Sequence, residues 1–448
     1  MARQIGVRRI VLSEYGQPIQ CWLTDSELSG LRDANARWSQ ALGLPTDPIR
    51  IDYKTDGSVM LRAEQVTGVI RAGNLDLEIA PKFLQSAKEG WQEVLWQILS
   101  LVEGGLIDAA DTSAAVQDNI GIPDLLADMF IASFTIGSAR GLPRRYRSQN
   151  AEGPVLRGRF DQSRIVQWSA QPWIVPFIED ALSYDTDAAR LFKWTASTLF
   201  GMVHSPVRVR ALRAIYENLS FASNRPPHPL DAHRVQLGSQ YRALSPALLV
   251  SLLVLQGQGI RHMHGDLTAS GFLWNSDEVY ERFVYWLCQK VAHTRGAHVD
   301  KRTIAFGEII AGSGYRLETT PDVVFRGPDN SPFAVIDAKY KRFGNRPKAS
   351  DTYQLIAAAH VLGCEKVALT YPAEAHRVAT TWRVRSALGG RQLELTALPL
   401  DLMVLTKRNG LEELTRVIEN WLSPANDDRG QCQWVVAMSW LNASVGVR

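Results

Sequence analysis

The sequence has few cysteines and no long apolar run. Only four cysteines occur among 448 residues, far apart and without a Cys-x-x-Cys pair. This spacing predicts neither a disulfide framework nor a cysteine zinc site, and a reducing cytoplasm fits it best. The longest apolar stretch, Ala247 to Leu255, is too short for a membrane span, which needs about 18 residues, and the N-terminus lacks an apolar signal core. We therefore expect a cytoplasmic protein without a membrane association.

The chain also lacks a strong net charge and a phosphate-binding loop. Its 49 lysines and arginines face 46 acids, so the net charge is only +3, and any contact with nucleic acid must come from a local patch. No GxxxxGK[S/T] motif occurs, so we expect no nucleotide-hydrolysing motor within the chain. With 46% hydrophobic and 21% charged residues, the composition is that of a folded protein.

The length and the changing pattern predict an α+β multidomain protein with three parts. Residues 1–83 form a β-rich domain, in which Thr24 and Glu27 cap a helix through Gln40 and hairpins turn at residues 56–57 and 73–74. Before this helix, strands at residues 8–12 and 19–22 flank a turn and form a first hairpin. Residues 84–262 form a mainly helical region that an arginine-rich loop interrupts. Residues 263–448 form an α/β domain.

The predicted elements of the last two parts follow from their periodicity. In the central part, helices are expected within residues 90–201 and at residues 208–219 and 246–255. In the third part, the expected order is helix, strands, helix and strand, at residues 277–291, 315–317, 323–325, 333–336, 350–362 and 366–370.

The chemistry is concentrated in a predicted β-hairpin of the third part. Asp322 precedes an apolar strand, the turn at residues 327–330 follows, and Asp337 and Lys339 end the second strand. Residues two apart point to the same face of a strand, so Asp337 and Lys339 lie together and Asp322 faces them. Two carboxylates bind Mg²⁺ or Mn²⁺ through oxygen, and a lysine beside them orients water or stabilises the charge on phosphate.

This constellation has two helical neighbours and one competing interpretation. Glu281, on the preceding helix, and Gln354, on the following helix, are candidates for the same site. The alternative is a surface ion pair at the hairpin end. Asp329 offers a second motif match, but Pro-Asp-Asn is ordinary turn chemistry, so we reject it.

Four segments resemble McrC, the PD-(D/E)xK endonuclease subunit of McrBC-type modification-dependent restriction systems. The residues after Asp337, which read Ala-Lys-Tyr-Lys, and the later Asp351 and Tyr353 to Ala357 resemble its nuclease core. The other three segments resemble an N-terminal hairpin, a central leucine-arginine-glycine segment and the helix before the nuclease hairpin: residues 67–82, 155–161 and 280–284.

The resemblance implies a Mg²⁺-dependent endodeoxyribonuclease for restriction, that is, defence against phage. Asp322 and Asp337 would hold the metal, and Lys339, Glu281 and Gln354 would complete the catalytic site. McrC-like subunits work with a McrB-like ring of AAA+ subunits, typically GTPases, that recognises DNA and translocates. Double-stranded DNA, including modified DNA, is the expected substrate, residues 1–83 are the expected docking element, and pairing of two nuclease domains is a further expectation.

A basic patch is the candidate for DNA contact. Residues 140–164 hold seven arginines and only two acids. They would neutralise phosphates and make binding salt-dependent, whereas the competing interpretation is a solvated basic loop. The expected DNA-binding residues are Arg144, Arg145, Arg147, Arg157 and Arg159.

Other interpretations stay open at this point. His262, His264 and Asp266 offer too few ligands for a zinc site, and we favour a loop there. A catalytically silent regulatory or scaffold subunit of the ring is one alternative function, and intact Asp322, Asp337 and Lys339 argue against it. A stand-alone repair or mobile-element nuclease is another, which leaves the N-terminal resemblance unexplained.

Overall fold

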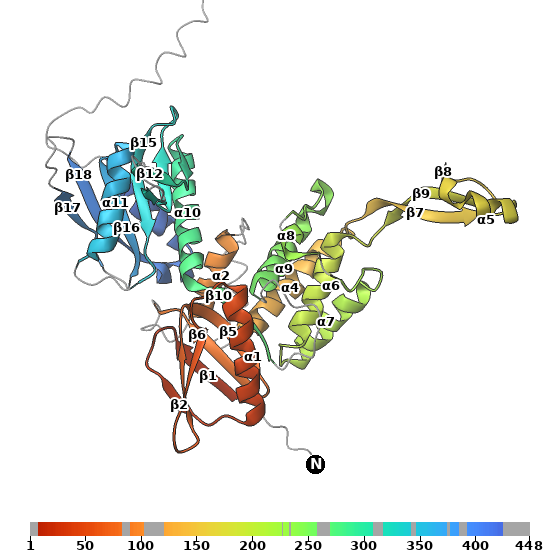
Figure 1. Cartoon of the computed structure of the whole chain (residues 1–448), viewed down its shortest axis with the longest axis horizontal. Helices are drawn as coiled ribbons and strands as arrows, with labels where there is room; N and C mark the ends of the chain where they lie inside the picture. Colours follow the sequence, from red (N-terminus) through yellow and green to blue (C-terminus); the bar gives the residue numbers. More distant parts are fainter. Residues whose placement is uncertain are drawn as a thin grey trace, which may run out of the picture.

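The computed structural model arranges the chain as three bodies and one projecting arm (Figure 1). The described residues are 8–82, 90–102, 121–225, 227–232, 234–257, 269–307, 317–341, 346–373, 377–384 and 392–423. The architecture is α+β with several sheets, as the sequence predicts.

The N-terminal body contains two small sheets and one helix. Its elements are β1 (Arg8–Ser13), β2 (Ile19–Cys21), α1 (Asp25–Ala41), β3 (Ile49–Tyr53), β4 (Val59–Ala63), β5 (Val66–Ala72) and β6 (Leu75–Ala80). The predicted capping box of Thr24 and Glu27 starts α1, and the second and third predicted hairpins form, β3 with β4 and β5 with β6. The first predicted hairpin is wrong, because β1 and β2 pair with other strands: β1 runs parallel to β6, and β2 pairs with β4. The core buries Leu31 and Trp38 of α1.

A strand from much later in the sequence completes the N-terminal sheet. The antiparallel strand β10 (Ala269–Asn275) lies beside β5, in the order β1-β6-β5-β10. The two backbones are so close at Gly68 that a Cβ there would lie 1.9 Å from the carbonyl oxygen of Phe272. Only glycine fits such an approach. The division into three segments stays a prediction, and β10, from the third of them, belongs to the sheet of the first.

The central body is helical, as predicted. Its elements are α2 (Trp91–Val102), α4 (Ile122–Ser138), α6 (Asp187–Phe200), α7 (Pro206–Asn218), α8 (Pro229–Ala232), the 3₁₀ turn η3 (Ser239–Leu244) and α9 (Ser245–Gly257). The rings of Phe130, Phe134 and Phe192 lie 5.5–6.5 Å apart between α4 and α6 and join these helices into one core. None of the described helices is long and apolar enough to span a membrane.

The predicted arginine-rich loop is wrong, because these residues form a β-structured arm. It consists of β7 (Arg145–Gly153), β8 (Arg159–Phe160), the 3₁₀ turn η2 (Gln162–Arg164), α5 (Ile165–Ala170) and β9 (Val175–Ser183). Nine residue pairs join β7 to β9, and the arm projects from the helical body (Figure 1). Strand β7 is mostly exposed and lacks apolar alternation, so its sequence carries no strand signal.

The third body is a six-stranded sheet between helices. Its elements are α10 (Ser276–Thr294), β11 (His298–Asp300), β12 (Ile304–Gly307), β13 (Leu317–Thr319), β14 (Val323–Arg326), β15 (Pro332–Ala338), α11 (Ala349–Leu362), β16 (Lys366–Ala373), β17 (Thr380–Val384), β18 (Leu393–Asp401), the 3₁₀ turn η4 (Leu402–Thr406) and α12 (Gly410–Leu422). The strand order is β11-β14-β15-β16-β18-β17, and β12 pairs with β13 apart from it.

The two faces of the six-stranded sheet pack against different helices. Val335 belongs to a cluster with Leu355 of α11, whereas Ala334 and Ile336 join the core that includes α10 and α12. This alternation is why β15 reads as a continuous apolar run, as expected for a strand buried on both faces. The predicted helices and strands of this part are confirmed where they lie within the described residues.

The cysteines fit the expectation of no disulfide framework. Cys21, Cys288 and Cys364 are buried free thiols. Burial raises the pKa of the Cys364 thiol to about 11, so it stays protonated and unreactive near neutral pH. Cys432 lies outside the described residues.

Candidate functional site

The predicted hairpin brings Asp322 and Asp337 together. Val323 faces Ile336 in the antiparallel ladder, so Asp322, one residue earlier, lies across from Asp337. The amide of Ala338 donates a hydrogen bond of 2.8 Å to Asp322 Oδ2. Both carboxylates are buried, with exposed fractions of 6% and 4%. Two buried acids at one strand end carry a large desolvation cost, which a cation would offset.

Lys339 supplies a positive charge at this position. Its ammonium forms an ion pair with Asp337 Oδ2, which confirms that the two side chains share one face of the strand. Burial raises the pKa of Asp337 to about 6; Lys339 lowers it in part, and nearby Asp322 raises it again. Burial lowers the pKa of Lys339, but the combined attraction of Asp337, Asp351 and Asp322 outweighs this effect and leaves the pKa above its usual value.

The turn of the hairpin supports the choice of Asp322 over Asp329. Asn330 adopts a positive φ of 67°, and its amide bonds to the carbonyl of Gly327. Asp329 Oδ1 accepts hydrogen bonds from the amide and hydroxyl of Ser331. The Asp329 carboxylate is therefore committed to the turn.

Glu281 reaches the site through a lysine that no sequence motif marks. Lys301 Nζ lies 3.0 Å from Asp322 Oδ1 and 3.3 Å from Glu281 Oε2, so it bridges the two acids. Burial raises the pKa of Glu281, and Asp322 raises it further. Lys301 follows the three-residue strand β11, which pairs with β14 and so carries the lysine to Asp322. No sequence signal marked this pairing, because β11 is too short for a periodic pattern.

Gln354 forms no hydrogen bond with the described residues of this constellation. It is exposed on α11 and makes no side-chain hydrogen bond to another residue in the described ranges. Instead, Asp351, at the start of α11, forms an ion pair with Lys341, two residues beyond Lys339. This ion pair ties the helix to the end of the hairpin. A catalytic role for Gln354 stays a prediction.

The donor chemistry fits a hard divalent cation. Asp322 and Asp337 offer carboxylate oxygens, and Mg²⁺ is commonly held by one or two carboxylates with water completing its shell. Across the ranges that the structure describes, no cluster of three or more His, Cys, Asp or Glu side chains forms a larger metal cage. His262, His264 and Asp266, for which we predicted a loop, lie outside the described residues.

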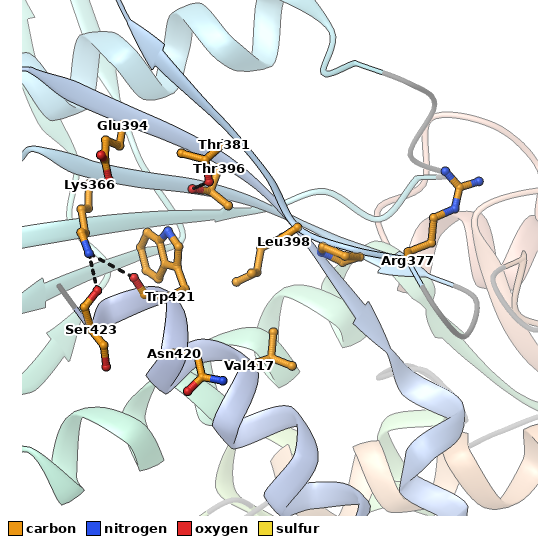
Figure 2. Close-up of a pocket in the computed structure, with 12 residues that line it drawn as sticks. Lys366, Arg377, Thr381, Glu394, Thr396, Leu398, Val417, Asn420, Trp421 and Ser423 are labelled. Carbon is orange, nitrogen blue, oxygen red and sulfur yellow. Dashed lines mark hydrogen bonds between the residues drawn. The ribbon is translucent and has the colours of Figure 1, made fainter. Parts of the chain in front are cut away.

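A cavity of about 440 Å³ lies elsewhere, between β17, β18 and α12 (Figure 2). There, the ammonium of Lys366 donates hydrogen bonds to the carbonyl oxygens of Trp421 and Ser423, at 3.3 Å and 2.6 Å. Lys366 thus caps the C-terminal end of α12. None of the predicted site residues lines this cavity.

The predicted DNA-binding arginines lie on or beside the arm, at the opposite end of the molecule from the six-stranded sheet (Figure 1). Arg145 pairs with Asp187 at 3.1 Å and Arg147 with Asp185 at 3.5 Å. Hydrogen bonds to Tyr184 and Tyr241 raise the pKa of Arg144.

Arg157 and Arg159 are the arginines of this set with the freest charges. They are exposed, and neither forms an ion pair with a described acid. Contact with DNA stays a prediction for all five arginines, and these two are the best placed for it.

The leucine-arginine-glycine segment separates into structural and exposed parts. A Cβ at Gly158 would lie 2.2 Å from the carbonyl oxygen of Ile178, so glycine lets β8 approach β9. Asp161 is buried and caps the turn at Ser163. Val155 and Leu156 are exposed, although they are apolar.

The fold and the site define a multidomain α+β protein with an acid, acid and lysine constellation at a hairpin end. The family model of the McrBC 5-methylcytosine restriction system component matches residues 61–372, which include the four segments that resemble McrC. Because this match covers more than half of its length, the chain belongs to this family. The resemblance to McrC that the four segments indicate is confirmed.

One solved structure supports the fold. A chain of the Thermococcus gammatolerans assembly described as a refined half-complex of McrB AAA+ hexamers with bound McrC is similar over 92% of this chain and 99% of that chain, with a TM-score of 0.59 and 15% identity. A chain of the cryo-EM structure of the Thermococcus gammatolerans McrBC complex is similar over 63% and 88%, with a TM-score of 0.46 and 16% identity. Among curated proteins, none matches the chain.

Proposed function

We propose that the chain is the DNA endonuclease subunit of an McrBC-type restriction system. The observation that carries this proposal is the placement of Asp322, Asp337 and Lys339 at one end of the β14–β15 hairpin. The PD-(D/E)xK fold and metal-dependent hydrolysis of DNA are parts of the same proposal. Buried charges of this kind are costly, so function is a better reason for them than stability.

The proposed chemistry follows from the side chains. Asp322 and Asp337 would hold Mg²⁺ or Mn²⁺, which when bound activates water and screens the charge that develops on phosphate. Lys339 would hold the attacking water or a phosphate oxygen by its ammonium. Lys301 would keep the Glu281 and Asp322 charges balanced at the edge of the site.

An AAA+ ring is the proposed partner. The related Thermococcus gammatolerans assembly contains McrB AAA+ hexamers with bound McrC, and the present sequence has no GxxxxGK[S/T] loop. The motor would therefore be a separate subunit.

The first test measures DNA cleavage by the full chain with its AAA+ partner, nucleotide and Mg²⁺. Asp337→Ala is expected to reduce cleavage at least about a thousandfold, because a metal ligand is lost while the core volume is kept. Circular dichroism serves as the folding control. Cleavage by Asp337→Ala at the wild-type rate would refute the metal assignment.

Two surfaces are candidates for docking onto the ring. The N-terminal body, proposed on the basis of the sequence, exposes Val11 and Trp22. The arm exposes a second set of large apolar side chains, namely Val155, Leu156, Ile165, Val166 and Trp173. Contiguous exposed apolar groups often mark protein interfaces.

Matched surface variants separate the two docking candidates. Deleting residues 1–83 would also remove the strand partner of β10, so substitution is the better design. Val11→Asp with Trp22→Asp is compared with Leu156→Asp with Val166→Asp, since all four side chains are exposed. The pair that abolishes co-purification with the ring and stimulation of its nucleotide hydrolysis identifies the docking surface. The outcome does not affect the nuclease assignment.

A further inference from the structure

A buried polar junction connects the N-terminal body to the end of the catalytic hairpin. Glu14 directly follows β1 and has an exposed fraction of 0%. Its backbone is fixed, because its amide donates to the carbonyl of Ala80 at 2.9 Å and the residue forms a bridge with Ala63. The carboxylate therefore extends from a rigid point of the N-terminal sheet.

Tyr340 meets this carboxylate from the other side of the junction. Its hydroxyl donates a hydrogen bond of 2.7 Å to Glu14 Oε2, across 326 positions of sequence. The amide of Lys82 donates to the same oxygen at 3.2 Å. The Lys82 ammonium lies 3.9 Å from the centre of the Tyr340 ring and 3.9 Å from Asp277 Oδ1, at the start of α10. Tyr340 is thus held by both its hydroxyl and its ring.

Tyr340 directly follows Lys339, where the support from the sheet stops. Strand β15 ends at Ala338, and the amide of Lys339 makes one more bond, of 2.8 Å, to the carbonyl of Thr370. Beyond this bond, side chains hold the segment: Tyr340 through Glu14, and Lys341 through Asp351. The direction of the Lys339 side chain depends on this anchoring, because Lys339 is the last residue of the segment whose amide bonds to a neighbouring strand.

We propose that Glu14 is a positioning residue for Lys339 and acts through the Tyr340 hydroxyl, so that the N-terminal body completes the nuclease site. This inference rests on the proposed nuclease function. A hydrogen bond to a buried carboxylate is stronger than one between neutral groups, so the bond to Glu14 contributes strongly to holding the Tyr340 hydroxyl in place. Small displacements of catalytic groups reduce rates strongly.

The test is steady-state cleavage by the full chain with its ring, nucleotide and Mg²⁺. Tyr340→Phe and Glu14→Ala are each expected to lower kcat about tenfold with an unchanged KM for DNA, because Lys339 acts in the transition state and the DNA-binding surface is untouched. Glu14→Gln keeps an acceptor for the Tyr340 hydroxyl and is expected to retain kcat within about twofold of wild type. The double variant with Glu14→Ala and Tyr340→Phe is expected to lose no more than either single variant.

Asn35→Ala is the matched control. Asn35 is also buried in the N-terminal body, where its amide side chain bonds both backbone groups of Ile49, at 2.6 Å and 3.0 Å. Its loss is expected to destabilise that body and leave kcat near wild type. If Glu14→Ala does not fold, Tyr340→Phe and Glu14→Gln still decide the question.

The outcomes separate this inference from the function on which it rests. If the wild-type chain cuts and Asp337→Ala does not, but Tyr340→Phe keeps the wild-type kcat, the positioning role is refuted and the nuclease assignment stands. Losses that add in the double variant, or a kcat that falls as far in Asn35→Ala, would also overturn it. Equal cleavage by the wild type and Asp337→Ala would instead refute the proposed function.

Discussion

The end of the β14–β15 hairpin and the arm are both rich in charge, but the charges have different surroundings. At the hairpin, Asp322 and Asp337 are buried beside Lys339. On the arm, Arg145 and Arg147 are exposed and paired with acids of the same chain. Burial makes a charge costly, so a buried cluster of charges points to function. An exposed ion pair contributes little to stability and gives no comparable indication of function.

Of the substitutions at the hairpin end and on the arm, the largest effect is expected at Lys339, beside the buried acids. Lys339→Ala should reduce cleavage at least about a hundredfold, as loss of a charge-stabilising donor commonly does. Because Lys339 is not a proposed metal ligand, calorimetry should show Mn²⁺ binding retained here and lost in Asp337→Ala. Lys366→Ala is the control, since Lys366 caps α12 on the same sheet. Loss of Mn²⁺ binding by Lys339→Ala as complete as that of Asp337→Ala would indicate a structural ion pair.

Glu14 is a second buried acid, and it should make the free energy of unfolding depend on pH. Burial raises the pKa of Glu14 from 4.5 to about 7, although Lys82 and Tyr340 oppose it. The folded chain then binds more protons than the unfolded chain between these two values, so the free energy of unfolding falls as pH rises through this window. This fall in the free energy of unfolding is about 3 kcal/mol, which is the pKa shift of Glu14 multiplied by 1.36 kcal/mol per unit. Glu14→Gln should abolish it.

Urea unfolding of the wild type and Glu14→Gln at pH 5 and pH 8 measures this difference. Asn35→Ala provides the comparison, because its buried amide does not titrate and its loss should be equal at both pH values. The same pH dependence in Glu14→Gln and wild type would show that Glu14 is not the group responsible.

The smallest effect is expected for the exposed arginines of the arm. Arg157→Ala with Arg159→Ala should lower the salt slope of DNA binding by about 2, because each free charge that meets a phosphate contributes about 0.9. Arg145→Ala with Arg147→Ala should change the slope less, since Asp187 and Asp185 already meet these charges. Binding measured across salt concentrations tests both pairs. An equal change in slope would mean that the intramolecular ion pairs open on DNA.

The local parts of the candidate site follow from the order of residues in the chain. The residue order around Asp322, Asp337 and Lys339 predicted the hairpin and the shared strand face, because the period of a strand is fixed by backbone geometry. The capping box at Thr24 and the predicted helices followed from equally local rules. Membership of the McrBC component family was likewise readable from short segments in order.

Contacts between residues far apart in the chain depend on how the folded elements pack. Lys301 reaches Asp322 because β11 pairs with β14, and Glu14 reaches Tyr340 because β1 and β15 end at one junction. The arm formed where the sequence predicted a loop, because β7 takes its strand conformation from pairing with β9 and not from its own pattern. Contacts across hundreds of positions depend on how buried surfaces pack, and no local period of the chain records that.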